Sequence, residues 1–226
     1  TDEFLRMSPE YARKYDRGGP EIFVGEWAAH EDARIRPWNA ETHRQPPTPS
    51  MKAAIGDAVF MAAMERNSDL IKMHCYAPLL VNVNPGARQW RPNLIGYDAL
   101  SSFGSPSYFA FRMFSRNVGN QLLPVATTNT SVQGCATRDD KTGETFIKLV
   151  NPDSNSLPLN INFKHVRSLE RIGTAIVLSG DPDEINSLAA PRKISPTVRK
   201  LTAISSAFRW TMPPTSVVVL RLREKH

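Results

Sequence analysis

One carboxylate in this sequence lies where carboxylates often do chemistry. Glu26 follows the apolar run Glu21-Ile22-Phe23-Val24 and stands between Gly25 and Trp27. A short, continuously apolar run is typical of a strand buried on both faces of a parallel sheet. The carboxyl ends of such strands form the catalytic face of α/β barrels, so Glu26 is a candidate catalytic residue. The alternative is a glutamate that pairs with a neighbouring arginine or is merely exposed at a strand end.

The loop that follows Glu26 is long and rich in polar and aromatic residues. Long strand-to-helix loops at the catalytic face usually shape a substrate pocket, and we expect residues 29–48 to do so. Glu31-Asp32 in this loop and Asp139-Asp140 further on are expected to be solvated loop charges. The polar and aromatic residues of the loop are His30, Glu31, Asp32, Trp38, Asn39 and His43.

The elements that must position Glu26 alternate between strand and helix up to Asn117. A helix is predicted after the loop, with Thr48 as its cap, Pro49 at its first position, one apolar stripe and an end at Asn67. A second buried strand is predicted over 70–76. Ser105-Pro106 then opens a helix over 108–116 that is apolar nearly all round. This order is that of a parallel α/β sheet or barrel.

After Gly119 the pattern changes to short β-rich runs between turn signals, as in an antiparallel β-sandwich. We therefore expect a boundary near 117–120, with an α/β part over 1–117 and an all-β part over 118–226. Residues 118–226 carry 14 basic and 9 acidic residues, a net charge of +5, against +1 (14 and 13) for residues 1–117. The predicted strands cover 131–137, 145–150, 157–163, 174–178 and 216–222.

Composition excludes several classes of protein. Hydrophobic residues make up 41% of the 226 residues and charged residues 22%, enough to bury a core and too apolar for wholesale disorder. No apolar run approaches the roughly 18 residues of a membrane span. The net charge of +6 is scattered along the chain, so we expect no nucleic-acid partner. The two cysteines cannot form a zinc site alone, no metal-ligand spacing occurs, and no cofactor is implied.

Several segments together resemble the α-L-arabinofuranosidases of glycoside hydrolase family 51. The segment 19–28 resembles the nucleophile strand of that family, and the likeness continues in order through 64–69 and 74–82 to 90–95 and 104–108. Beyond residue 120 the likeness is looser and is carried by 185–194 and the strand pattern. Two features depart from the usual family pattern. Trp27 stands where many members have Tyr, and the loop over 29–48 is longer than in plant-type members.

The resemblance implies a fold and a role for Glu26. The segments matched are the seventh and eighth strands of a (β/α)8 barrel with their helices, followed by the C-terminal β-sandwich. Glu26 would be the nucleophile of a retaining glycosidase, which uses two carboxyl groups about 5–5.5 Å apart. The family's general acid is a Glu directly after an Asn, and no Asn-Glu dipeptide occurs in this chain. We therefore expect the chain to be the C-terminal part of a larger polypeptide.

Candidate substrate-binding residues are less specific. Tyr76 and Trp90 lie at or after the end of the second strand and could face a sugar ring, although core packing is the alternative for both. Asn82 and Asn84 follow the same strand and could hydrogen-bond hydroxyl groups. Trp27, next to the nucleophile, is expected to affect the fit of the substrate.

The expected function is hydrolysis of terminal α-L-arabinofuranosyl groups in oligosaccharides and plant cell-wall polysaccharides. One alternative is a non-catalytic sandwich module with a barrel remnant, which serves structure or carbohydrate binding. Another is a related retaining glycosidase that acts on a different sugar. The resemblance adds a homo-oligomer as an expectation, because members of the family often form one, and plant-polymer substrates would agree with an extracellular location. No membrane association is expected.

Overall fold

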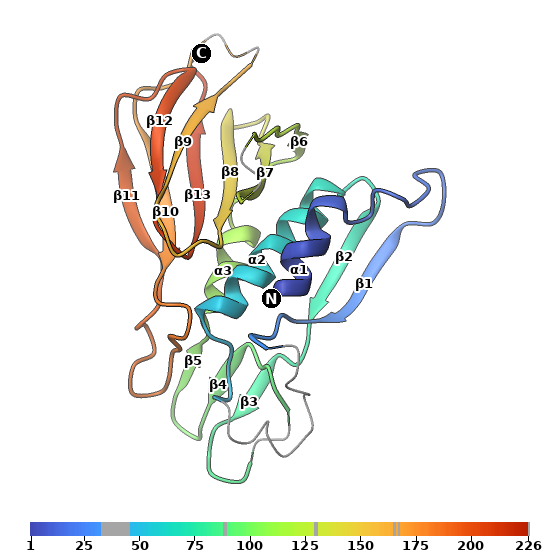
Figure 1. Cartoon of the computed structure of the whole chain (residues 1–226), viewed down its shortest axis with the longest axis vertical. Coiled ribbons are helices and arrows are strands. Elements are labelled where there is room, and N and C mark those ends of the chain that lie inside the picture. The colour runs from blue at the N-terminus through green and yellow to red at the C-terminus, as the bar shows by residue number, and fades with distance from the viewer. Residues whose placement is uncertain (33–45, 88–89, 129–130, 165, 167, 226) are drawn as a thin grey trace.

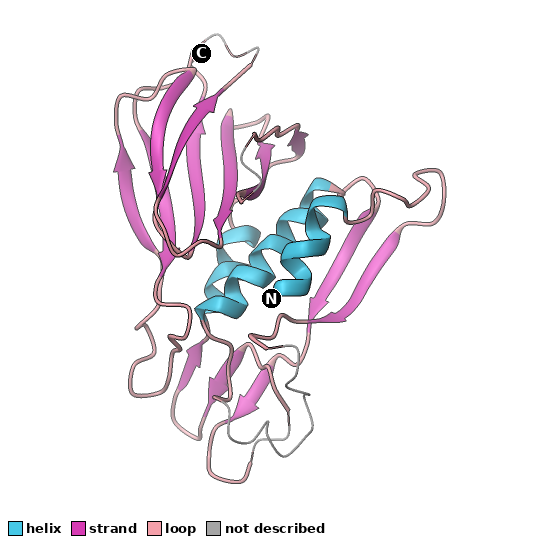
Figure 2. Ribbon diagram, in the orientation of Figure 1, coloured by secondary structure: helices cyan, strands magenta, loops and turns pink. Residues whose placement is uncertain are grey.

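The computed structural model describes residues 1–32, 46–87, 90–128, 131–164, 166 and 168–225. A layer of helices lies between a two-stranded sheet on one side and a β-sandwich on the other (Figures 1 and 2). One hydrophobic core runs through these layers, from Trp27 on the first sheet through the helices to Val217 and Val219 of the sandwich. None of the described helices is long and apolar enough to cross a membrane.

The two-stranded sheet contains the predicted strands of the first half. Strands β1 (Ile22–Trp27) and β2 (Ile71–Tyr76) pair in parallel, so both carboxyl ends lie at one edge of the sheet. The expectation that both strands are buried on both faces is wrong, because four consecutive residues of β2 from Lys72 are exposed. The helices cover one face of this pair, and the described residues leave the other face open.

Helix α2 (Met51–Arg66) follows β1 and differs from its prediction in two respects. Its N-cap is Ser50 and not Thr48. The N–H groups at its start donate to acceptors from distant segments: Ser50 N to the Glu31 carboxylate at 2.7 Å, and Met51 N to the Glu184 carbonyl at 2.9 Å. The helix also has no single apolar stripe. It is buried nearly all round from Met51 to Met64, because it lies between two sheets.

Helix α3 (Pro106–Ser115) matches its prediction closely. The Ser105 hydroxyl accepts a hydrogen bond from Tyr108 N at 3.1 Å, which caps the helix.

Before α3 lies a small sheet that the sequence patterns did not predict. Its strands are β3 (Leu80–Asn82), β4 (Ile95–Tyr97) and β5 (Ser102–Gly104). Helix α1 (Asp2–Met7) and the 3-10 turn η1 (Ser8–Glu10), also unpredicted, pack on α2, and the ring of Phe4 stacks on that of Phe60 at 4.5 Å.

The second half is an antiparallel β-sandwich, as predicted. A six-stranded sheet in the order β11-β10-β13-β8-β7-β6 faces the two-stranded sheet β12-β9, and a second hydrophobic cluster fills the space between them. Beyond the five predicted strands, the sandwich contains β6, β11 and β12. The strands are β6 (Gln121–Leu123), β7 (Gln133–Arg138), β8 (Glu144–Asn151), β9 (Leu157–Asn162), β10 (Gly173–Ser179), β11 (Thr197–Leu201), β12 (Ala207–Met212) and β13 (Ser216–Arg223).

A buried ion pair joins the helices to the sandwich. The Lys148 side chain on β8 has no solvent exposure, and its Nζ donates to Glu65 Oε2 of α2 at 2.5 Å and to the Phe114 carbonyl of α3 at 3.1 Å. The next residue of α2, Arg66, donates to the Gly134 carbonyl of β7 at 2.8 Å. These polar contacts fix the register between the helical layer and the six-stranded sheet.

Candidate functional site

Glu26 lies near the carboxyl end of β1, and an irregularity in the strand sets its direction. Ile22 and Val24 pack toward the helices, and unbroken alternation would point Glu26 the same way. The pairing register shifts between Val24 and Glu26, so that Glu26 lies opposite Cys75 and Trp27 opposite Tyr76. A bulge of this kind moves every later side chain to the other face. Trp27 is therefore buried, and Glu26 is exposed on the open face.

The face around Glu26 is apolar and open. Phe23 and Met73, on the two strands, are 56% and 61% exposed. Among the described residues, no hydrogen-bond donor or cation contacts the Glu26 carboxylate. A nucleophilic carboxylate must stay ionised, and the described part of the chain supplies no group in contact with Glu26 that would hold it in its charged state.

Trp27 and Tyr76 point to the helix side of the sheet. Both are 8% exposed. The rings of Trp27 and Phe60 meet edge-on with their centroids 4.9 Å apart. The rings of Tyr76 and Phe111 meet in the same way with their centroids 5.2 Å apart. The structure thus gives both rings a packing role, and contact with a sugar stays a prediction for them.

The other predicted sugar contacts lie beyond the end of β2. Trp90 is 47% exposed, and its carbonyl accepts a hydrogen bond from Asn93 Nδ2 at 2.6 Å. Asn82 is half-buried and its Oδ1 accepts from Asn84 N at 3.0 Å, while Asn84 is exposed. These side chains are accessible, and their substrate role stays a prediction. Trp38, Asn39 and His43 of the predicted pocket loop lie outside the described residues.

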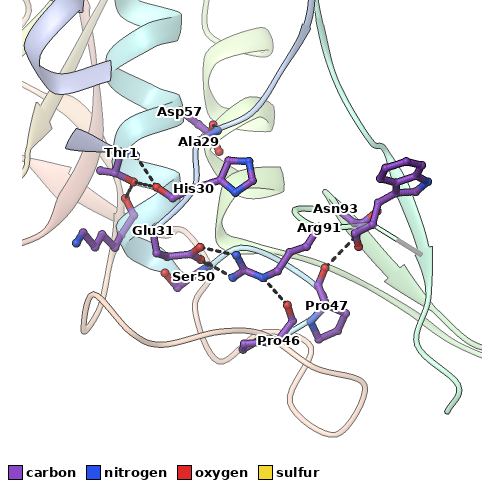
Figure 3. Close-up of polar contacts among 12 residues, drawn as sticks. Thr1, Ala29, His30, Glu31, Pro46, Pro47, Ser50, Asp57, Arg91 and Asn93 are labelled. Atoms are coloured by element: carbon purple, nitrogen blue, oxygen red, sulfur yellow. Dashed lines mark hydrogen bonds and ion pairs between the residues drawn. The ribbon is translucent and has the colours of Figure 1, made fainter. Parts of the chain in front are cut away.

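An ion pair in the segment after β1 was not predicted from the sequence, and the expectation for Glu31 is wrong. Glu31 is not a solvated loop charge: Arg91 Nη1 and Nη2 donate to its two carboxylate oxygens at 2.7 and 2.9 Å (Figure 3). The Arg91 side chain is only 2% exposed, and its Nε donates to the Pro46 carbonyl at 2.6 Å. Burial raises the pKa of Glu31, but the hydrogen bonds and charge of Arg91 outweigh it, so the pKa lies below its ordinary value.

A fully buried carboxylate holds the segment between Glu26 and Glu31. Asp57 of α2 has no solvent exposure, and its Oδ1 accepts a hydrogen bond from Ala29 N at 2.7 Å (Figure 3). Burial raises the pKa of Asp57 to about 7, against the lowering effects of the Ser107 hydroxyl and the Ala29 amide. An aspartate inside an apolar helix is the sequence signal that could have identified this contact. Among the described residues, no three metal-ligand side chains gather in one place.

The parallel strand pair with a carboxylate at its end, its covering helices and the attached antiparallel sandwich define an α/β unit joined to a β-sandwich. Residues 25–216 match the profile of the family described as "Alpha-L-arabinofuranosidase C-terminal domain". The chain belongs to this family and corresponds to the C-terminal part of the α-L-arabinofuranosidases of glycoside hydrolase family 51.

Individual relatives agree with this assignment. Alpha-L-arabinofuranosidase A of Aspergillus kawachii is 35% identical over 214 residues, 93% of this chain and 30% of the relative. The extracellular exo-alpha-L-arabinofuranosidase of Streptomyces chartreusis is 36% identical over 132 residues, 58% of this chain and 14% of the relative. The chain therefore spans less than a third of the length of these curated relatives.

Solved structures show the same fold. An arabinose-bound family 51 α-L-arabinofuranosidase superposes with a TM-score of 0.90 at 32% identity, over 99% of this chain and 35% of that one. The arabinose complex of the Thermotoga maritima enzyme superposes with a TM-score of 0.70 over 98% of this chain and 47% of that one. Its identity of 17% makes it evidence for the fold alone.

Proposed function

We propose that this chain is the C-terminal part of a retaining α-L-arabinofuranosidase, with Glu26 as its nucleophile. The observation that carries this proposal is the bulge at Gly25, which turns Glu26 out of the packed core at the carboxyl end of a parallel strand. The substrates would be terminal arabinofuranosyl groups of plant oligosaccharides and polysaccharides. The relatives' names support this substrate, and one of them is an extracellular enzyme.

The open face and the parallel pairing of β1 and β2 support a barrel context for these strands. Strands β1 and β2 would be the last two strands of a (β/α)8 barrel, with α2 and α3 as the outer helices that follow them. Both strands have an unpaired edge among the described residues, and their exposed face holds Phe23 and Met73. In a closed barrel this face would be the interior, where side chains from further strands cover it.

The general acid would lie outside this chain. A retaining glycosidase needs a protonated carboxyl group beside its ionised nucleophile. Glu31 is held as an anion by Arg91, and Glu65 is paired with the buried Lys148. Neither side chain is free to donate a proton to a leaving oxygen.

Covalent trapping in the full-length protein tests the proposal. The fluorine of an activated 2-deoxy-2-fluoro-arabinofuranoside slows both steps of a retaining enzyme, while its good leaving group keeps the first step fast enough for the glycosyl-enzyme to accumulate. We expect peptide mass spectrometry to find the fluorosugar on Glu26. A label on another carboxylate, or hydrolysis with inversion of the anomeric centre, would refute the assignment.

A second candidate function is a non-catalytic module, which the lack of partners around Glu26 in the described residues favours. In that case the sandwich would serve structure or carbohydrate binding. Binding of arabino-oligosaccharides to the full-length protein with no turnover of any arabinofuranoside would support this candidate over the enzyme.

A further inference from the structure

A groove lined by arginines lies between α3 and the six-stranded sheet, away from Glu26. Its volume is about 450 Å³. Arg112 and Arg116 come from the last turn of α3 and its C-cap, Arg192 from the loop before β11, and Arg221 from β13. Ile176 of β10 lies among the apolar lining. Elements from both halves of the chain thus bring four guanidinium groups to one groove, which we call the arginine groove.

The positive charge of the arginine groove is largely uncompensated. Arg221 Nη2 contacts both carboxylate oxygens of Glu144 at 3.0 Å. In the described part of the chain, Arg112, Arg116 and Arg192 have no carboxylate partner. The helix dipole explains cations at the end of α3, but it does not explain Arg192, which reaches the groove from a separate loop.

The basic surface continues along the sheet from the arginine groove. Arg221 and Lys200 both pair with Thr174 of β10, one from each side, so they lie on the same face in one cross-strand row. Two strand spacings, roughly 10 Å, separate these positions. Lys200 is exposed. The charges therefore form a track that suits a chain with repeated anionic groups better than a single small ion.

We propose that the arginine groove binds carboxylate groups of an acidic polysaccharide. Guanidinium groups bind carboxylates through paired, charge-assisted hydrogen bonds, and three of them here have no carboxylate partner among the described residues. The choice of a polysaccharide rests on the proposed function, because an enzyme for plant polymers meets chains that carry uronic acids. A nucleic acid fits less well, since the aromatic side chain of the groove, Phe109, is buried and offers no ring for base stacking.

Binding of polygalacturonate to the full-length protein tests the proposal. The variant Arg112→Gln/Arg192→Gln removes two charges from the groove and breaks no ion pair that the described residues form. The control Arg199→Gln/Arg209→Gln removes two exposed charges elsewhere: Arg199 pairs with the buried Ala175, so it lies on the opposite face of the six-stranded sheet, and Arg209 is on β12. Affinity electrophoresis in gels with polygalacturonate or neutral arabinan gives Kd for each form.

We expect polygalacturonate binding to weaken about tenfold or more in the groove variant and to change less than about twofold in the control. Neutral arabinan retention and turnover of an aryl arabinofuranoside should be the same in both, which separates this proposal from the proposed enzyme function. The proposal would be overturned if the two variants lost polygalacturonate affinity equally, or if the parent protein did not bind polygalacturonate. It would also be overturned if duplex DNA bound more tightly than polygalacturonate and this binding depended on the groove arginines.

Discussion

Arg91 and Glu31 form a two-point ion pair across sixty residues of sequence, with both carboxylate oxygens bound at 2.7–2.9 Å. The same Glu31 carboxylate binds Ser50 N at the start of α2. One anion therefore joins the segment after β1, the first turn of α2 and the segment before β4. This places a fixed charge network directly after the strand that carries Glu26.

Breaking this pair should destabilise the fold strongly. Arg91→Met leaves the Glu31 carboxylate, 17% exposed, without its cation, and we expect the free energy of unfolding to fall by about 3 kcal/mol. Urea unfolding at pH 7 measures the change. Arg13→Met, in the exposed Arg13–Glu10 pair, is the control and should leave the free energy of unfolding nearly unchanged. Similar losses in the two variants would contradict the importance given to the Arg91–Glu31 pair.

Asp57 should make stability depend on pH. Its pKa rises from 3.8 to about 7 on folding, so between these values the folded state holds a proton that the unfolded state has lost. The contribution of Asp57 to the free energy of unfolding is therefore present in full below about pH 4. It falls by about 4 kcal/mol at most as the pH rises toward 7.

The variant Asp57→Asn isolates this effect. Asparagine keeps an oxygen for Ala29 N and cannot ionise. We expect its stability relative to the parent to increase between pH 5 and pH 8, as measured by thermal unfolding at each pH. A constant difference across that range would show that Asp57 does not titrate there.

The sequence predicted the elements around Glu26 better than the contacts between them. Apolar runs identify β1, β2 and the main sandwich strands, and Ser105-Pro106 identifies the start of α3, because these signals are local. The bulge at Gly25 changes the face of the sheet to which the later side chains of β1 point, and the composition of the strand gives no sign of it. The Arg91–Glu31 pair is invisible to local patterns because the partners are sixty residues apart. Edge strands such as β11, with a basic and mixed sequence, lack the apolar alternation that predicts strands.

The open face of β1 and β2 should drive self-association of the 226-residue chain. Phe23 and Met73 are exposed on a strand pair whose outer edges are unpaired among the described residues, and such surfaces associate. We expect sedimentation velocity to detect oligomers or aggregates, and the variant Phe23→Ser/Met73→Ser to reduce them. Leu100→Ser, at a 94% exposed loop residue, is the matched control. A clean monomer with a cooperative melt would contradict this expectation.

Residues 1–226 alone should hydrolyse nothing. General acid catalysis contributes typically about 10²–10⁴-fold, and the candidate acids Glu31 and Glu65 are both paired with cations. The Glu26 carboxylate is also open to water, which screens its charge. Release of nitrophenol from an aryl α-L-arabinofuranoside should equal that of the Glu26→Gln version of the same chain. Turnover that depends on Glu26 would show that a carboxyl group within this chain serves as the acid.

The most direct test of the central claim is chemical rescue of Glu26→Ala in the full-length protein. Removal of the nucleophile should lower turnover of an aryl α-L-arabinofuranoside by several orders of magnitude, and azide should restore part of it by attack from the vacated space. An arabinofuranosyl azide with inverted anomeric configuration would confirm Glu26 as the nucleophile, because azide then replaces the aryl group in one displacement. A variant that keeps more than about a tenth of parent turnover, with no effect of azide, would remove Glu26 from the mechanism.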